Sequence, residues 1–195
     1  RKCFEYKGRG LRIPLTAEEL KEKAKTSIGI DSNSEVIQIK HLAMQIELIN
    51  EQLVEIDKKI EEFSRQANSP ILSIPGISHF SGTSILAELG DIRNYTKASQ
   101  IIKFAGVAPY HYESSQFTAQ HTAITKKGSR YLRKTLYQII LPVINHNKVF
   151  NAYYNKKLSE GKGHRCAQGH CIRKLLRIIY HLLSTGETFD PALLM

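Results

Sequence analysis

The sequence has no long hydrophobic run and few cysteines, and each absence excludes a class of protein. No uninterrupted apolar stretch approaches the roughly 20 residues that a membrane-spanning helix needs, and no apolar signal segment follows the basic start Arg1-Lys2. Three cysteines, Cys3, Cys166 and Cys171, are too few for a disulfide framework. We therefore expect a cytoplasmic protein that neither binds a membrane nor is exported.

The composition is that of a globular protein. Of the 195 residues, 42% are hydrophobic and 24% are charged, which excludes a disordered tail. This length suits one domain with an appendage, or two small domains. Because the chain starts on Arg1 and not on Met, we expect it to be a piece of a longer protein.

Acidic residues are scarce in one part of the chain only. Residues 1–69 contain 12 Lys and Arg and 12 Asp and Glu, whereas residues 70–195 contain 16 and 6. The whole net charge of +10 therefore belongs to the second part. Such a surface attracts polyanions, of which nucleic acid is the commonest in a cytoplasm. The alternative is a basic face that only keeps the protein in solution.

The N-terminal third predicts two helices. Thr16 followed by acidic residues indicates a short helix from Ala17 to Lys25 within a linker that covers residues 1–34. Residues 35–68 form a second segment, whose apolar residues recur at alternating spacings of three and four: Ile39, Leu42, Ile46, Ile49, Leu53, Ile56, Ile60 and Phe63. This heptad pattern predicts a coiled coil, either between copies of the chain in a homo-oligomer, which we expect, or folded back within one chain. The alternative is an amphipathic helix packed on its own domain.

Residues 69–195 form the third segment, which we expect to be a helical domain. It opens with a short helix, a tight turn at Gly76 and a second helix, the pattern of a helix-hairpin-helix. Such hairpins hold nucleic acid through backbone groups, here Gly76, Ile77 and Ser78, although some are purely structural.

The rest of this segment predicts three more helices. One follows Asp91 and ends at Phe104, a long one starts near Arg130, and the last runs from His164 to Leu183 before Gly186. Pro142 should kink or end the long helix, and a loop rich in Asn and Lys should follow it. Residues 110–125 favour a β-hairpin or an ordered loop. The predicted fold class is all-α, with a coiled-coil arm and one short β-hairpin.

Cations gather where the long helix starts. A helix N-terminus favours anions through its dipole and free N–H groups. The sequence therefore predicts a phosphate site there, although a solvated basic face is the alternative. Its residues are Lys126, Lys127, Ser129, Arg130, Arg133 and Lys134.

The loop just before this helix contains Glu113-Ser114-Ser115-Gln116-Phe117. A serine that faces a phosphate-binding helix end can attack phosphorus once a metal or a base activates its hydroxyl. Loop serines are also common hydrogen-bonding residues, so spacing alone does not select Ser114.

Four strings of residues carry a resemblance to a known family. They are Ile74-Pro75-Gly76-Ile77 with Ala87-Glu88-Leu89-Gly90-Asp91, Phe104-Ala105-Gly106-Val107-Ala108-Pro109, Ile124-Thr125-Lys126-Lys127-Gly128-Ser129-Arg130-Tyr131-Leu132-Arg133, and Arg173-Lys174-Leu175-Leu176-Arg177-Ile178-Ile179-Tyr180 with Thr185-Gly186. In this order they resemble the carboxy-terminal domain of the IS-one-ten family of insertion-sequence transposases. These are bridge-RNA-guided recombinases related to pilin-gene invertases.

The resemblance implies an active site shared between two domains. In the family a serine of this loop, usually in a Ser-Gly pair, is the nucleophile, so Ser114 matches it and Ser115 replaces the glycine as a second choice. The family also has an N-terminal RuvC-like domain whose acidic residues bind Mg²⁺, and this chain contains no such set. We therefore expect DNA and a guide RNA as partners, no metal site in this piece, no activity of the piece alone, and a nucleoid-associated location in a bacterium.

Other readings of the sequence are weaker. His164, Cys166, His170 and Cys171 have the residue types of zinc ligands without the usual paired spacing. His170 and Arg173 match the H-x-x-R of tyrosine recombinases, but the supporting arginine and tyrosine are not evident.

Three neighbouring aromatic side chains are further candidates for contact with nucleic acid. Tyr110, His111 and Tyr112 can stack on bases or serve in packing.

A non-catalytic helix-hairpin-helix module that only binds nucleic acid is one rival function. A coiled-coil scaffold with an incidental basic surface is the other.

Overall fold

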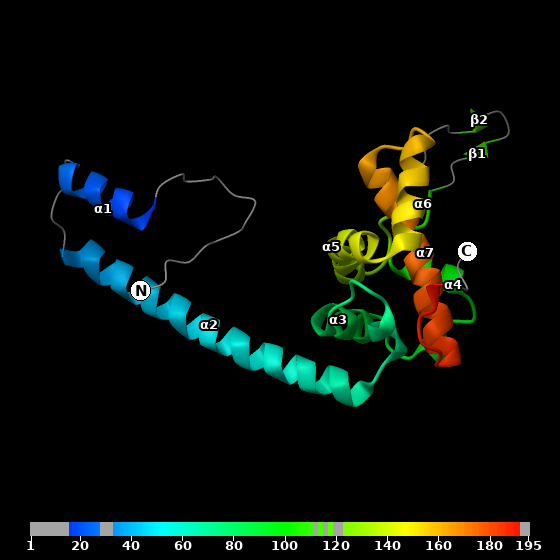
Figure 1. The fold of residues 1–195 in the computed structure, drawn as a ribbon, viewed down its shortest axis with the longest axis horizontal. Coiled ribbons are helices and arrows are strands. Elements are labelled where there is room, and N and C mark those ends of the chain that lie inside the picture. The colour runs from blue at the N-terminus through cyan, green and yellow to red at the C-terminus, as the bar shows by residue number, and fades with distance from the viewer. Residues whose placement is uncertain (1–15, 28–32, 111–112, 115–116, 119–122, 192–195) are drawn as a thin grey trace. The chain divides into compact units, whose positions relative to one another are not determined.

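The fold of the chain is known from a computed structural model that describes residues 16–27, 33–110, 113–114, 117–118 and 123–191 (Figure 1). The chain divides into two compact units, Arg1–Asn50 and Glu51–Met195. Helices dominate both units, which confirms the predicted all-α fold class. The predicted segment boundaries after residues 34 and 68 stay predictions.

Two helices precede the carboxy-terminal helices. Helix α1, Ala17–Thr26, starts with a capping box in which Thr16 Oγ1 accepts from the Glu19 N–H, and Glu19 Oε2 accepts from the Thr16 N–H at 2.7 Å. Helix α2, Asn33–Ala67, covers the whole heptad segment. Its seam residues are more than half exposed, apart from Ile60. The predicted helices are therefore present, and the seam of α2 is open to solvent.

A 3₁₀ turn, a tight turn and a helix follow α2, and the predicted helix-hairpin-helix stays a prediction. The 3₁₀ turn is η1, Pro70–Ser73, and the helix is α3, His79–Leu89, with Ser78 as its N-cap. Gly76 lies between them at φ +95°. A Cβ at this glycine would lie 2.7 Å from the backbone of Pro142 and Val143. The glycine is needed here because the turn packs directly on another helix.

The remaining elements of the second unit are η2 Ile92–Asn94, α4 Ala98–Phe104, β1 Glu113–Ser114, β2 Phe117–Thr118, α5 Arg130–His146, α6 Lys148–Ser159 and α7 His164–Thr185. Strands β1 and β2 are antiparallel. Helices α4, α5 and α7 match predicted helices. The C-cap of α7 is Gly186 in the left-handed conformation, also as predicted.

The prediction of a loop after Pro142 is wrong. Helix α5 continues through Pro142 to His146, and α6 follows after the single residue Asn147. Asn147 Oδ1 accepts from the N–H groups of Val149 and Phe150, so it caps α6 in the usual way. Phe150 and Tyr154, one turn apart, are buried and hold α6 on the core. Lys148, Asn151, Asn155 and Lys156 of α6 occupy the exposed face, and these polar residues hid the helix in the sequence.

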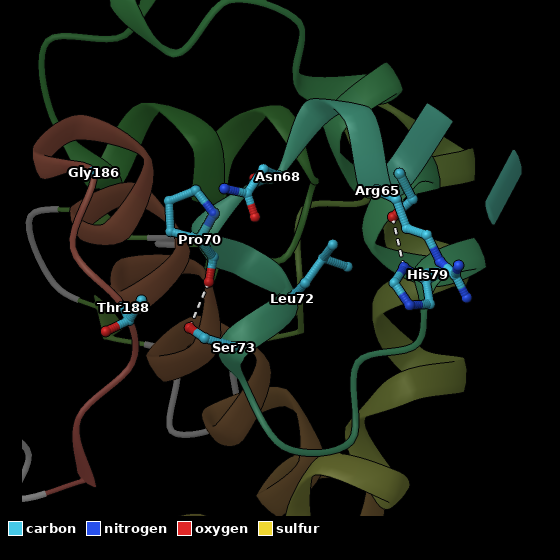
Figure 2. Close-up of a pocket in the computed structure, with 10 residues that line it drawn as sticks. Arg65, Asn68, Pro70, Leu72, Ser73, His79, Gly186 and Thr188 are labelled. Carbon is cyan, nitrogen blue, oxygen red and sulfur yellow. Dashed lines mark hydrogen bonds between the residues drawn. The ribbon is translucent and has the colours of Figure 1, made fainter. Parts of the chain in front are cut away.

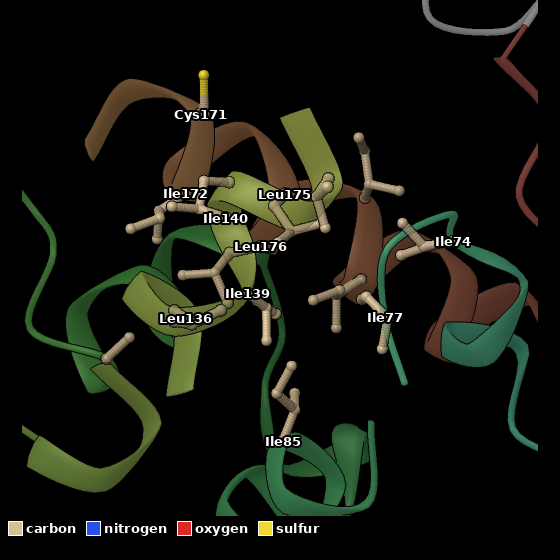
Figure 3. Packing of buried hydrophobic residues seen from close by; sticks show 14 of the residues in the cluster. Ile74, Ile77, Ile85, Leu136, Ile139, Ile140, Cys171, Ile172, Leu175 and Leu176 are labelled. Atoms are coloured by element: carbon tan, nitrogen blue, oxygen red, sulfur yellow. The ribbon is translucent and has the colours of Figure 1, made fainter. Parts of the chain in front are cut away.

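The core of the second unit lies between α3, α4, α5, α6 and α7. Figure 3 shows Leu136, Ile139 and Ile140 of α5 next to Leu175 and Leu176 of α7. Ile74 and Ile77, which follow η1, and Ile85 of α3 close the same cluster. This packing sets the position of the start of α5, where the predicted site lies.

None of the helices in the described part of the chain is long and apolar enough to cross a membrane.

Candidate nucleic-acid interface

The start of α5 is tied to two other elements through Ser129. The Ser129 hydroxyl accepts from the Leu132 N–H at 3.0 Å and donates to Glu88 Oε2 of α3 at 2.6 Å. The Ser129 N–H donates to the Phe104 carbonyl, at the end of α4, at 2.7 Å. Ser129 is thus the N-cap of α5 and the point where α3, α4 and α5 meet.

Gly128 makes the approach to α4 possible. It has φ +119°, and a Cβ at this residue would lie 2.1 Å from the Phe104 carbonyl oxygen. No side chain fits in that space. The chain therefore passes directly over the end of α4, and this contact places the first turn of α5.

The segments before and after the serine loop are joined at its base. The Thr125 N–H donates to the Ala108 carbonyl at 2.9 Å, and the Tyr110 N–H donates to the Ala123 carbonyl at 2.8 Å. Pro109 and Ile124 form an antiparallel bridge between these two contacts. Two strings that lie about 15 residues apart in the sequence therefore form one extended stem beside the start of α5.

The serine predicted as nucleophile lies beyond this stem. Ser114 pairs with Phe117, and Glu113 with Thr118, in the short β1–β2 ladder. Ser115 lies outside the described residues. The structure thus places the backbone of Ser114 on the loop that leaves the stem.

The predicted cations lie around the same stem. Lys126, Lys127, Arg130 and Lys134 are exposed. The Arg130 guanidinium lies 4.8 Å from the centre of the Tyr131 ring and donates to its hydroxyl at 2.7 Å. These cations and the stem therefore form one exposed basic surface.

Arg133 differs from the other cations because it is partly buried. Its Nη1 donates to the carbonyls of Ala105 and Lys126, at 3.3 and 3.2 Å. Arg133 therefore also holds the base of the loop in place.

The turn around Gly76 has its own packing roles. Ile77 is only 9% exposed and belongs to the core. The Ser78 hydroxyl accepts from the Ser81 N–H at 3.2 Å, so it caps α3. Of the three residues, Ser78 alone is exposed. The nucleic-acid contact of Gly76, Ile77 and Ser78 stays a prediction.

The zinc-like residues do not come together in the described part of the chain. No group of three or more His, Cys, Asp or Glu residues able to hold a metal ion occurs there. His164 Nδ1 contacts the hydroxyl of Tyr154. Cys166 is exposed, whereas Cys171 is buried, which raises the pKa of its thiol to about 11.

The other weak candidates are His170 and Arg173 of α7 and the aromatic side chains at positions 110–112. Burial, together with the charges of Arg173, Lys157 and Lys162, lowers the pKa of His170. Arg173 Nη1 contacts the Val107 carbonyl at 3.4 Å. Tyr110 is exposed, and His111 and Tyr112 lie outside the described residues.

A cavity of about 480 Å³ lies elsewhere in the second unit, between the end of α2, η1 and the segment after α7 (Figure 2). Within it, Ser64 Oγ is hydrogen-bonded to His79 Nδ1 at 2.9 Å. Arg65, a cationic residue that lines the cavity, forms an ion pair with Glu61. None of the predicted site residues lines this cavity, so we assign it no part in the basic surface.

Sequence reasoning missed Glu88, Tyr137 and Arg173 as parts of this region. Glu88 and Arg173 lie inside strings that carry the family resemblance. Only the structure shows that Glu88 contacts Ser129, the N-cap of α5, and that Arg173 contacts the Val107 carbonyl. Tyr137 has no signal in the sequence beyond the one-turn spacing from Arg133.

Comparisons with known proteins agree with this architecture. The family described as "Transposase IS116/IS110/IS902 family" matches residues 68–155, which include α3, α4, α5 and the serine loop. Residues 68–155 therefore belong to the IS116/IS110/IS902 family of transposases.

Three relatives match most of this chain. The 42 kDa protein of insertion element IS900 from Mycobacterium paratuberculosis is 28% identical over 79% of the chain and 39% of its own length. The transposase for insertion sequence element IS1111A from Coxiella burnetii is 28% identical over 71% and 37%. The pilin gene-inverting protein of Moraxella bovis is 24% identical over 78% and 47%. The chain spans less than half the length of each.

Proposed function

We propose that this chain is the carboxy-terminal part of a DNA transposase or recombinase, which binds DNA at the start of α5 and supplies Ser114 as the nucleophile for strand cleavage and exchange. One observation carries the proposal. The stem of the serine loop is hydrogen-bonded to the segment that leads into the basic first turn of α5. A phosphate held by that turn lies next to the loop.

The start of α5 suits a backbone phosphate. The dipole of a 17-residue helix favours an anion at its N-terminus. Lys126, Lys127 and Arg130 add exposed positive charge at the same end. Contacts of this kind position DNA without reading its sequence.

The proposed reaction exchanges one ester of phosphorus for another. The serine oxygen forms a bond to phosphorus, and the bond from phosphorus to a deoxyribose oxygen breaks. The serine loses its proton, and the sugar oxygen gains one. The resulting phosphoserine link keeps the energy of the cleaved bond for the later joining step. Ser115 is the second choice for the same role.

The family resemblance implies a Mg²⁺ site in an N-terminal RuvC-like domain. Within the described residues no cluster of carboxylates, histidines and cysteines can hold a metal ion. We therefore assign the Mg²⁺ ligands to a RuvC-like domain outside this sequence. On this proposal the chain alone is inactive.

The partners of the proposed enzyme follow from its two kinds of surface. The open heptad seam of α2 suits a second copy of the same helix, which makes the enzyme a homo-oligomer. The excess positive charge of residues 70–195 suits DNA and a guide RNA. A guide-directed enzyme leaves sequence reading to base pairing.

The decisive experiment is recombination by the full-length protein, with donor DNA, target DNA and guide RNA. Wild type, Ser114→Ala and Ser115→Ala are compared, and covalent protein–DNA adducts are trapped and mapped. We expect Ser114→Ala to abolish both adduct and recombination while DNA binding stays nearly unchanged. Loss in Ser115→Ala alone moves the nucleophile by one residue. Full activity of both variants overturns the serine proposal.

A second candidate function is a non-catalytic module that binds nucleic acid and assembles the enzyme. The packing of the Gly76 turn against α5 favours a structural role for this turn. If neither serine variant changes recombination but Lys126→Gln and Lys127→Gln weaken DNA binding, this function replaces the first.

A further inference from the structure

A tyrosine hydroxyl lies at the contact between α5 and α7. A Cβ at Gly169 of α7 would lie 3.6 Å from the Tyr137 hydroxyl oxygen of α5, which is ordinary van der Waals contact. Tyr137 is half-buried, and no described residue is hydrogen-bonded to its hydroxyl group. The contact therefore leaves a polar group at a helix–helix junction without a protein partner among the described residues.

Three arginines surround this hydroxyl because of helix geometry. Residues four apart lie one above the other on a helix, about 6 Å apart along its axis. Arg165 and Arg173 are therefore on the same side of α7 as Gly169, one turn before it and one turn after it. Arg133 lies one turn before Tyr137 on α5. All three cations thus border the point where Tyr137 meets Gly169.

Electrostatics agree with this placement. Burial raises the pKa of Tyr137, and the charges of Arg173, Arg133 and Arg165 act in the opposite direction. No carboxylate of the described residues forms an ion pair with any of the three arginines. Three like charges brought together without an acidic partner favour an anion between them.

The arginines also contact the foot of the serine loop. Arg133 Nη1 donates to the Ala105 carbonyl at 3.3 Å, and Arg173 Nη1 donates to the Val107 carbonyl at 3.4 Å. A guanidinium group has five N–H donors in a planar fork. Each of these two side chains therefore holds the loop through one nitrogen and keeps other donors for a ligand.

We propose that Arg133, Arg165 and Arg173, together with the Tyr137 hydroxyl, form a second phosphodiester-binding site between α5 and α7. It would hold a backbone phosphate of nucleic acid at a distance from the phosphate at the start of α5. The proposal rests on the proposed function, since both sites serve the same nucleic acid. The site assigns a binding role to Tyr137, Arg165 and Arg173, and a second role to Arg133.

The test measures binding of the 195-residue chain to labelled duplex DNA and to an RNA duplex of the same sequence, by fluorescence anisotropy over a range of salt concentrations. The variants are Arg165→Gln, Arg173→Lys and Tyr137→Phe. Arg93→Gln is the control, because it removes the same charge from an exposed residue that is already paired with Asp91 at 2.7 Å. Circular dichroism checks the fold of each variant.

We expect Arg165→Gln to weaken binding about tenfold and to reduce the slope of log K against log salt by about 1. Arg173→Lys keeps its charge but loses the fork, so a clear loss is expected there too. Arg93→Gln should have little effect. If the variants lose affinity for DNA alone, the site holds a DNA phosphate, and if they lose affinity for RNA alone, it holds an RNA phosphate. Loss of affinity for both means that the site accepts either nucleic acid.

Two failures are distinguishable. If wild type binds and Lys126→Gln weakens it, while Arg165→Gln and Tyr137→Phe behave as Arg93→Gln does, the second site is wrong and the proposed function stands. If wild type binds neither nucleic acid, both proposals fail. Because Arg165 is exposed and no described residue forms an ion pair with it, its substitution leaves the fold intact and keeps the test valid.

Discussion

Helix α2 and the group of elements from η1 to α7, here called the helical bundle, use apolar side chains in opposite ways. Among the residues that the structure describes, the bundle buries 25 hydrophobic residues in one cluster. The seam of α2 has the same residue types, Ile and Leu, but leaves almost all of them more than half exposed. Burial of such side chains is worth about 1.5–3 kcal/mol each. The bundle obtains this free energy by internal packing, whereas the exposed seam of α2 does not.

The two regions differ in charge as well. Residues 1–69 have no net charge, and residues 70–195 have all ten excess positive charges. A net charge of +10 favours contact with polyanions in the second region, whereas the first region has no such excess. On the proposed function, assembly and nucleic-acid binding therefore belong to separate parts of the sequence.

The largest expected effect breaks the bundle at Gly128. Gly128→Ala forces a Cβ to within 2.1 Å of the Phe104 carbonyl oxygen, so we expect the free energy of unfolding to fall by more than about 4 kcal/mol. Urea denaturation measures the loss. Gly161→Ala is the matched control, since Gly161 also has a positive φ, +77°, but nothing lies within 4 Å of its Cβ position. Equal losses at both positions would contradict the close contact.

The next prediction sets a buried leucine against an exposed one. Leu175→Ala in the bundle should lower the free energy of unfolding by about 2–5 kcal/mol, because it leaves a cavity. Leu53→Ala in α2 should leave bundle stability nearly unchanged and shift the oligomer toward monomer, which sedimentation equilibrium measures. If Leu53→Ala destabilises the bundle as much as Leu175→Ala does, the seam packs on its own domain and not on a partner.

A smaller effect is expected at Ser129. Ser129→Ala removes the N-cap of α5 and the donor to Glu88, so the free energy of unfolding should decrease by about 1–2 kcal/mol. Thermal unfolding measures it, and Ser129→Thr, which keeps the hydroxyl, should restore most of the stability. The capping role is refuted if alanine and threonine give the same melting temperature.

The smallest effect concerns Cys171 and pH. Its pKa is raised from 9.0 to about 11 by burial, so the folded thiol keeps a proton that the unfolded thiol loses. The free energy of unfolding should therefore fall as pH rises from 9 toward 11, by less than about 1 kcal/mol up to pH 9.5. Denaturation at several pH values, compared with Cys171→Ala, measures this. A difference between the two proteins that does not vary with pH would show that the thiol is not shielded.

Only part of the site was predictable from the sequence. The basic residues from Lys126 to Lys134 form a local cluster around the start of a helix that the sequence predicts, so a local pattern was enough. The contacts of Ser129 with Glu88 and of Arg173 with Val107 join residues 41 and 66 positions apart. The periodic spacing of apolar residues does not predict contacts between residues so far apart in the sequence. Helix α6 was missed because Pro142 and a polar surface concealed two helices joined by one residue.

The sequence by itself determined the helices with strong periodicity and clear caps: α1 with its Thr16 capping box, α2 with its heptads, and α7 with Gly186 at its end. It also determined the uneven distribution of charge. The tertiary structure alone decided that the stem of the serine loop lies beside the start of α5, and that Tyr137 meets Gly169 between three arginines. The reason is physical: caps and periodicity act within a few residues, whereas these contacts depend on how the buried faces of α3, α4, α5 and α7 pack together.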